Sequence, residues 1–388
     1  MLEKLNHFPV NWVDGMKINK SHFIAMQDHV SDVIRDAMGT QLHSLNYGLI
    51  PFGNAGESFK ISLVIDNHKL LRVKVEECHA VTPNGSRIDI SSSNAHMLNI
   101  DMPYPEAVYE LDYDQDLVLL ANVSVNLFDK KPFGDPDPEE NPPRYPNVVP
   151  TFNLNLVQEK NENSNHGGYH LTLGKIIINK NESYLMSDYI PPCTSVQSHQ
   201  RLIDIHTKID RFFGQLELFT VQISQKINRK NQSNELALII LALSEKITTY
   251  LGTNINSFRW FAPHQPPAYM FDKVISLARM MKNYIDSKSG AGKEELLNYI
   301  AEWCGISQGE FEGTFTELVN VGYNHTQIDK TVAKTLQFIR ITDELFSTLN
   351  HLDYIGKRKD NGIFVKERLE LENVALDTSK RNKSFLED

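Results

Sequence analysis

The stretch "YIPPCTSVQSHQRLIDIHTKIDRFFGQLELFTVQIS", residues 189–224, marks an abrupt change in the pattern of the chain. Before it, short runs rich in Val, Ile and Leu alternate with turn residues, a pattern typical of strands. After it, helical spacing continues to about residue 352. This order predicts an α+β protein in which an antiparallel, β-sandwich-like N-terminal domain precedes a bundle of long helices.

Within this stretch, apolar residues recur every seven positions from Leu202 onward. The heptad seam consists of Leu202, Ile205, Ile209, Phe212, Leu216, Phe219 and Ile223. Such a seam occurs both in bundles formed by one chain and in oligomeric stalks. The sequence does not separate the two, and we favour oligomerisation.

The β-rich part is expected to occupy residues 1–192. Its predicted strands lie at 61–65, 70–75, 117–125, 152–157 and 169–178, and a helix is predicted at 20–46. The segment 129–147 carries six prolines and five acidic residues, so we expect a long Pro-rich loop there. A solvated connection is the favoured interpretation, and a loop that grips a partner is the alternative.

The helical part is expected at 193–353, with helices at 234–251, 266–285, 293–304, 308–321 and 326–352. Residues 234–251 are apolar on nearly all sides in their first half, which predicts a central core helix too short to span a membrane. In the remaining segment, 354–388, Asp360-Asn361-Gly362 predicts a hairpin, followed by a polar tail.

The composition of the chain narrows the classes of partner and the cellular compartment that we expect. Lys and Arg number 39 against 49 Asp and Glu, a formal net charge of −10, which disfavours nucleic acid as a partner. The N-terminus lacks the pattern of a secretory signal and no run of about 18 apolar residues is evident, so we expect a cytoplasmic protein. Cys78, Cys193 and Cys304 have no spacing typical of disulfides or zinc sites.

No motif predicts catalysis, a cofactor, a metal site or a small-molecule substrate. The segment "SKSGAGKEE", 287–295, resembles part of a phosphate-binding loop, but Glu294 stands where a Ser or Thr magnesium ligand is needed. His22 and His29 lie seven residues apart, and His166 and His170 lie four apart in a loop that leads into a strand. Neither pair has the helical spacing with an acidic residue that a zinc hydrolase uses.

The stretch "PVNWVDGMKINKSHFIAMQDH", residues 9–29, gathers conspicuous side chains near the N-terminus. The candidate site residues there are Trp12, Asp14, Met16, His22 and Phe23. Two interpretations remain open: these residues anchor the start of the β domain, which we favour, or they contact a partner directly. Asn19 precedes the helical spacing and is the expected N-cap.

Five motifs in one order carry a family resemblance. They are Trp12-x-Asp14-Gly15-Met16 followed by His22-Phe23 and Gln27-Asp28; Tyr47-Gly48-Leu49; "HAVTPNGSRIDI" at 79–90; "YIPPC" at 189–193; and "HQPPAYMFDKVISLARMM" at 264–281. Together they resemble TssK, the baseplate subunit of type VI secretion systems. The chain departs from the family pattern at Asp14, which replaces Glu, at Lys20-Ser21, which replaces Pro-Gln, and at Asn84, which replaces Asp.

The resemblance implies a cytoplasmic homotrimer at the inner face of the cytoplasmic membrane. It implies a noncatalytic adaptor whose β "shoulder" holds the TssF/TssG wedge of the baseplate and whose helical "neck" trimerises. A C-terminal "head" would contact the inner-membrane complex.

Only about 36 residues follow Leu352, too few for an independent head with its own core. We therefore expect a reduced head at 354–388 and a divergent, Bacteroidetes-type attachment to the membrane complex. The alternative is that the helices after about 293 form a recast head. The alternative function is a phage-type tail-tip protein that recognises cell-surface glycan, for which the region after residue 354 offers only Tyr354 and Phe364 as aromatic residues.

Overall fold

The fold was analysed in a computed structural model of the 388-residue chain. The structure describes residues 3–66, 70–94, 98–103, 105, 115–161, 168–179, 182–288 and 291–356. Contacts divide the chain into Met1–Gly356 and Lys357–Asp388, and all that follows concerns the first unit. The predicted hairpin around Asn361 and nearly all of the predicted reduced head lie outside the described residues.

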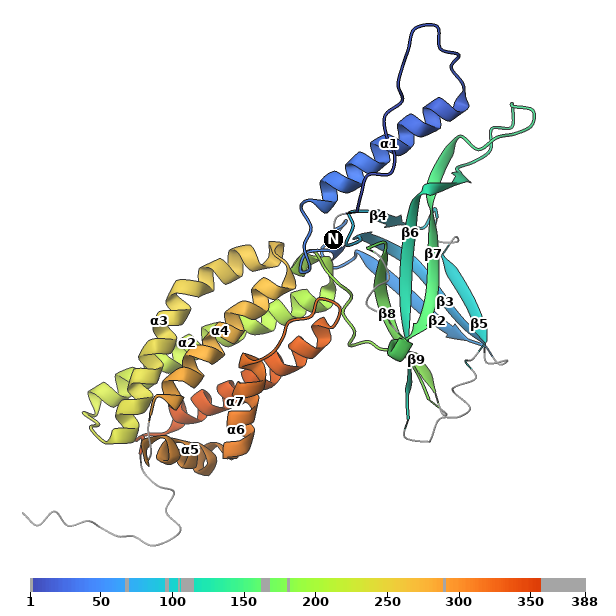
Figure 1. The fold of residues 1–388 in the computed structure, drawn as a ribbon. Coiled ribbons are helices and arrows are strands. Elements are labelled where there is room, and N and C mark those ends of the chain that lie inside the picture. Colours follow the sequence, from blue (N-terminus) through green and yellow to red (C-terminus); the bar gives the residue numbers. More distant parts are fainter. Residues whose placement is uncertain are drawn as a thin grey trace, which may run out of the picture. The chain divides into compact units, whose positions relative to one another are not determined.

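The β-rich part contains two antiparallel sheets (Figure 1). Their strands are β1 Gly48–Leu49, β2 Phe59–Ile65, β3 Leu70–Val81, β4 Arg87–Ile90, β5 Asn99–Pro103, β6 Leu117–Phe133, β7 Asn147–Gln158, β8 His170–Ile178 and β9 Ser183–Leu185. In the first sheet β3 is central and pairs with β1, β2, β4 and β5. In the second the order is β7-β6-β8-β9.

The two sheets pack through apolar side chains that alternate with exposed ones. Along β3, Leu71, Val73 and Val75 are buried while Arg72 and Lys74 between them are exposed, as expected for a strand with one wet face. A Cβ at Gly174 in β8 would lie 3.4 Å from the Cδ1 atom of Ile61 in β2. This close approach of the sheets confirms the predicted sandwich-like α+β fold.

The Pro-rich segment contains more strand than the sequence predicts. β6 continues past a bulge after Asn126, so that Lys130–Phe133 pair with Asn147–Pro150 and only residues 134–146 form the connection. Among the described residues, the pairing of β6 with β8 ends at Ser124, and Pro132 therefore lies where β6 pairs with β7 alone. A proline is tolerated at such a position, because one side of the strand needs no N–H donor.

The N-terminal helix is shorter than predicted. α1 spans Lys20–Gly39, and not 20–46. Asn46 folds back on the following loop: its side-chain Nδ2 donates to the carbonyl oxygen of Gln41 at 3.0 Å, and its Oδ1 accepts from the N–H of His43 at 2.6 Å. Such local side-chain bonds satisfy the backbone in a non-helical conformation.

The second part of the unit is a helical bundle. Its helices are α2 Gln200–Arg229, α3 Glu235–Phe261, α4 Pro267–Asp286, α5 Ala291–Cys304, α6 Gln308–Val319 and α7 Ile328–His351. α2 contains the predicted heptad seam, and the other five match their predicted ranges within a few residues, except that α3 extends ten residues beyond its predicted end. Pro267 opens α4, a position where a missing N–H costs nothing.

The length of α3 corrects the expectation that this helix is too short to span a membrane. Among the described residues, Glu235–His264 is the one helical segment long and apolar enough to do so by length and composition. Core helices meet the same criteria, and Leu236, Ile240, Leu243 and Ile247 of α3 are buried in the bundle.

The heptad seam lies inside this bundle. Six of its seven residues are buried and Phe219 is partly buried against the same core. The ring of Phe212 meets that of Phe338 in α7 edge-on at 6.2 Å, and the neighbouring Phe213 meets Phe258 in α3 at 5.1 Å. The seam thus packs against helices of its own chain, and the predicted homotrimer needs a different surface.

Candidate docking site at the N-terminal helix

Two motifs far apart in the sequence meet where the β-rich part joins the helices. The Leu49 N–H donates to the carbonyl oxygen of Pro192 at 2.7 Å, and the Thr194 N–H donates to that of Leu49 at 2.8 Å. A Cβ at Gly48 would lie 2.0 Å from the Pro192 oxygen, and Gly48 has a φ of +109°. Only glycine fits there. Residues of both motifs therefore form the contact by which the β-rich part joins the helical part.

A third motif supports α1. In "HAVTPNGSRIDI" the turn between β3 and β4 is closed by the side chain of Asn84, whose Oδ1 accepts from the Ser86 N–H at 3.1 Å and from the Thr82 hydroxyl at 2.6 Å. Gly85 follows with a φ of +94°, and a Cβ there would lie 2.2 Å from the carbonyl oxygen of Arg35 in α1. The turn between β3 and β4 therefore packs directly against the backbone at the C-terminal end of α1.

The fourth motif also reaches the junction, together with residues that the sequence analysis missed. The Val196 N–H, just beyond "YIPPC", donates to the carbonyl oxygen of Gln265 in "HQPPAY" at 3.1 Å. Buried His325 donates from Nε2 to the Tyr47 carbonyl oxygen at 2.9 Å and accepts the Tyr323 hydroxyl proton at Nδ1, also at 2.9 Å. Burial lowers the pKa of His325 to about 4, so the neutral ring is the form that fits.

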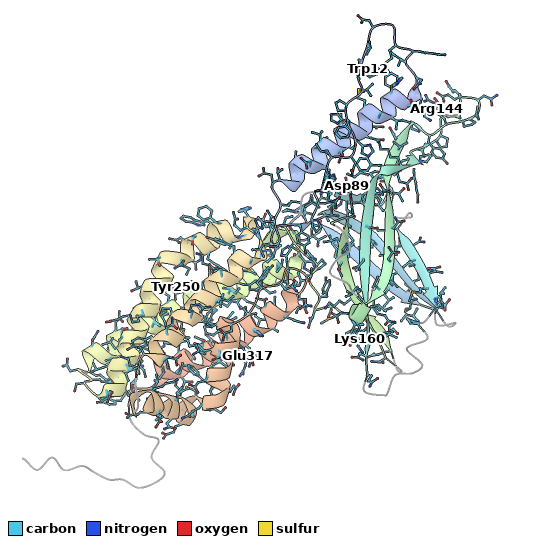
Figure 2. All side chains as sticks on the ribbon, viewed as in Figure 1. Trp12, Asp89, Arg144, Lys160, Tyr250 and Glu317 are labelled. Atoms are coloured by element: carbon cyan, nitrogen blue, oxygen red, sulfur yellow. The ribbon has the colours of Figure 1, made fainter. Side chains whose placement is uncertain are left out.

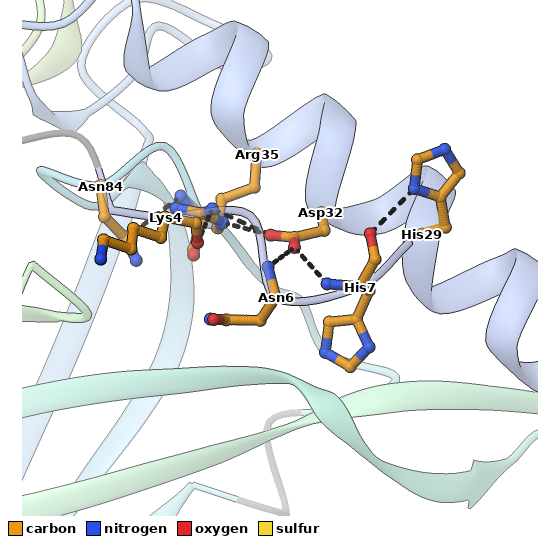
Figure 3. Close-up of polar contacts among 8 residues, drawn as sticks. Lys4, Asn6, His7, His29, Asp32, Arg35 and Asn84 are labelled. Carbon is orange, nitrogen blue, oxygen red and sulfur yellow. Dashed lines mark hydrogen bonds and ion pairs between the residues drawn. The ribbon is translucent and has the colours of Figure 1, made fainter. Parts of the chain in front are cut away.

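The N-terminal segment is fastened to α1 by a buried ion pair (Figure 3). Asp32 accepts from the backbone N–H groups of Asn6 and His7 at 2.7 and 3.0 Å, and it also accepts from Arg35 Nε at 2.9 Å. Arg35 donates in turn to the Lys4 carbonyl oxygen. Burial alone would raise the pKa of Asp32, but the bonds from His7 and Asn6 and the Arg35 charge outweigh it and hold that pKa below its usual value.

The predicted site residues lie at the start of α1, and Figure 2 shows Trp12 in the loop that precedes the helix. Trp12 is 48 % exposed and Phe23 is 55 % exposed, Asp14 is exposed, and Met16 and His22 are half-buried. The rings of Trp12 and His22 lie 6.0 Å apart. Neither Trp12 nor Phe23 fills a core of this chain, and Asp32 and Arg35 provide the attachment instead.

Asn19 and His22 cap the N-terminus of α1. Asn19 is the N-cap, as predicted, and its Oδ1 accepts from the Ser21 N–H at 3.0 Å. The Asn19 N–H donates to Nδ1 of His22 at 3.2 Å, which completes a capping box. His29 contacts the N-terminal segment, because its Nδ1 lies 2.9 Å from the His7 carbonyl oxygen.

No cluster of three His, Cys, Asp or Glu side chains that could hold a metal occurs within the described residues, and His166 lies outside them. The three cysteines are buried and none of them forms a disulfide bond. Burial raises the pKa of the Cys78 thiol to about 12, which disfavours the reactive thiolate. Lys293, in the segment like a phosphate-binding loop, is paired with Asp286 and Glu312, both at 2.8 Å.

The protein is a two-part scaffold. An antiparallel sandwich is joined to a helical bundle through contacts between residues of the sequence motifs. Scans of family models and of curated proteins find no match to this sequence. Among solved structures, a crystal structure of TssK aligns over 87 % of this chain and 69 % of that chain, at 13 % identity and a TM-score of 0.50. The chain therefore has a TssK-like fold, with a strongly divergent sequence.

Two further solved structures align less closely. A chain of the baseplate complex from the type VI secretion system aligns over 87 % of this chain and 99 % of that chain, at 10 % identity and a TM-score of 0.47. A chain of the TssK-TssF-TssG baseplate subcomplex aligns over 88 % and 99 %, at 10 % identity and a TM-score of 0.44.

Proposed function

We propose that this protein is a noncatalytic structural adaptor of a type VI secretion baseplate, which links a TssF/TssG-like wedge to the membrane-anchored complex. The observation that carries the proposal is the agreement of the fold with TssK over 87 % of the chain. It is supported by the TssK-like motifs at the junction between the sandwich and the bundle. Two of them contact each other, a third contacts α1, and a fourth bonds to Val196 just beyond "YIPPC".

The wedge is proposed to bind the β-rich part through the N-terminal loop. Trp12 supports this, because a large aromatic side chain that remains half-exposed beside a well-capped helix is a typical interface anchor. Asp14 is exposed beside it and provides a carboxylate that can accept hydrogen bonds from a partner's backbone.

Co-purification of the full chain with TssF- and TssG-like proteins of the same organism tests this proposal. We expect the wild-type chain to capture the wedge and Trp12→Ala to weaken capture by at least tenfold, as for an anchor residue. Trp260→Ala is the matched control, since Trp260 is 65 % exposed but lies on α3. Wild-type protein that captures no wedge protein would refute the adaptor function.

The C-terminal region is proposed to contact the inner-membrane complex from the cytoplasmic side. A chain that ends after Gly356, where the first compact unit ends, should keep wedge capture and lose capture of the membrane complex. If the truncated chain still captures the membrane complex, the helices after about residue 293 are the better candidate for that contact.

The adaptor is proposed to act as a homotrimer. A trimer would present three N-terminal loops to the wedge, and the resulting avidity would strengthen attachment without any new contact. Because the heptad seam packs within the chain, the surface that holds the copies together has to be sought elsewhere.

A further inference from the structure

A shallow groove with basic side chains lies between α3 and α4, and its volume is about 530 Å³. Two tyrosines join the helices there. Tyr250, labelled in Figure 2, donates from its hydroxyl to the Lys273 carbonyl oxygen at 2.7 Å. The Tyr284 hydroxyl donates to the Ile239 carbonyl oxygen at 3.2 Å. The polar residues that line the groove are Lys246, Ser276, Arg279, Asn283, Tyr284 and Ser287.

Two ammonium groups lie close to the ring of Tyr284 in this groove. The Nζ atom of Lys246 is 5.6 Å from the centre of the ring, and that of Lys288 is 4.7 Å from it. The ring attracts each cation and so restricts both side chains. The two charges are therefore no more than about 10 Å apart, and they repel each other. A bound anion would relieve this repulsion.

The cations of the groove have no carboxylate at helical spacing. No Asp or Glu stands three or four residues from Lys246, Arg279 or Lys288, the separations at which side chains of one helix meet. Asp286 pairs with two other lysines, and Arg279 donates to a neutral acceptor, the carbonyl oxygen of Val319, at 2.7 Å. The groove is therefore locally positive on a chain whose formal net charge is −10.

The negative charge of the whole chain does not cancel this local field. Exposed charges farther away than about 8 Å are largely screened at physiological ionic strength, so an anion in the groove interacts mainly with the cations beside it. The exposed amide of Asn283 can donate hydrogen bonds to a carboxylate. Met280 and Tyr284 also line the groove and are half-buried, and they add apolar surface for an uncharged side chain.

This chemistry favours an acidic peptide over a membrane surface. Carboxylates on alternate residues of an extended peptide lie about 7 Å apart, a spacing that can match the two ammonium groups beside Tyr284. A membrane-binding surface instead presents apolar side chains that enter the bilayer, or a larger cluster of basic residues. None of the residues that line the groove is an exposed large apolar side chain.

We propose that the groove between α3 and α4 binds an acidic peptide segment of a partner protein. Its three cations pair with carboxylates of the segment, and Met280 and Tyr284 contact an apolar residue of it. This site goes beyond the proposed function, because it gives the helical bundle a contact surface separate from the N-terminal loop. Ser287 and Lys288, which open the segment that resembles a phosphate-binding loop, then belong to a site for carboxylates.

Fluorescence anisotropy with the full chain tests the proposal. The probe is a fluorescein-labelled peptide in which pairs of glutamates alternate with single leucines, and the control peptide has glutamine in place of each glutamate. We expect the acidic probe to bind, with an affinity that falls as salt is raised, and the control peptide to bind about tenfold more weakly or less. Lys246→Gln combined with Lys288→Gln should weaken binding of the acidic probe by about tenfold, because two ion pairs are lost.

The matched control combines Lys330→Gln with Lys334→Gln. These lysines lie on α7 and do not line the groove. One is exposed and the other is half-buried, as are Lys246 and Lys288, so the control removes the same charge from similar surroundings. Its affinity for the acidic probe should stay within about twofold of the wild type, since attraction at that distance is screened.

Several results would overturn the inference: no binding of the acidic probe, equal binding of the two peptides, or equal losses in the groove variant and the control variant. Vesicles that contain phosphatidylglycerol test the membrane alternative. If the groove variant loses vesicle binding and keeps peptide binding, a membrane surface occupies the groove and the inference is wrong. Wedge capture by the groove variant should equal that of the wild type, so the inference and the adaptor function can fail independently.

Discussion

A Cβ atom at Gly48 would lie 2.0 Å from the carbonyl oxygen of Pro192. Gly48 also has a φ of +109°, where side chains are strained. Because the clash is with backbone, no rotamer change relieves it. We expect Gly48→Ala to lower the free energy of unfolding by about 3–5 kcal/mol, measured by urea denaturation.

The control for this prediction is Gly53→Ala. Gly53 has a φ of +56° and no heavy atom within 4 Å of an added Cβ, so only the conformational cost of about 1–2 kcal/mol applies. Equal effects of the two substitutions would show that the approach to Pro192 is not what Gly48 is needed for.

The contact between Gly48 and Pro192 also shows where sequence reasoning stops. The motifs "YGL" and "YIPPC" were recognised separately, but no local pattern states that residues 48 and 192 touch, because the sandwich folds between them. Local features were predictable: Asn19 caps α1 as expected, since a cap needs only its own neighbours.

The side on which α1 packs was not predictable from hydrophobicity. Asp32 and Arg35 are buried because the backbone of Lys4–His7 and their own pairing satisfy them, and those contacts form only in the fold. The heptad seam shows the same limit: its register was correct, but heptads do not say whether the partner helices belong to the same chain.

The buried ion pair of α1 predicts a local effect. Asp32→Asn removes the charge that balances Arg35 and leaves a buried guanidinium without its counterion. We expect the amide protons of Asn6 and His7, which bond to Asp32, to exchange on the order of 100-fold faster, since one partner of a buried pair is lost. Hydrogen exchange resolved by residue measures this.

Glu140→Gln is the matched control, because Glu140 pairs with Arg144 on the surface and exposed pairs contribute little to stability.

The lowered pKa of Asp32 makes the stability of this attachment depend on pH. The stabilisation is present above the unfolded pKa of about 4 and is lost as the pH falls through the lower, folded pKa. Slow exchange at Asn6 in Asp32→Asn would contradict the role of the pair.

His325 predicts a pH dependence of the whole unit. Its folded pKa is about 4, against about 6.5 in the unfolded chain. Between these values the unfolded state binds more protons, so stability is complete above pH 6.5 and falls as the pH decreases toward 4. The expected loss between pH 7.5 and 4.5 is about 2–3 kcal/mol.

Urea denaturation at both pH values should show this loss in the wild type and a smaller loss in His325→Gln, whose side chain does not titrate. His351→Gln is the control, because His351 is exposed at the end of α7. Identical pH dependence in wild type and His325→Gln would mean that the ring is not held neutral at the junction.

The heptad seam predicts a contrast between two leucines of α2. Leu216 is 1 % exposed inside the bundle and Leu218 is 53 % exposed, so the same substitution meets different surroundings on one helix. Leu216→Ala should lower the free energy of unfolding by about 3–5 kcal/mol because it leaves a cavity, and Leu218→Ala should change it by less than about 0.5 kcal/mol. The oligomeric state of both variants should match the wild type, because the seam packs against α3 and α7 of its own chain. A Leu216→Ala protein of unchanged stability that no longer self-associates would instead place the seam between copies.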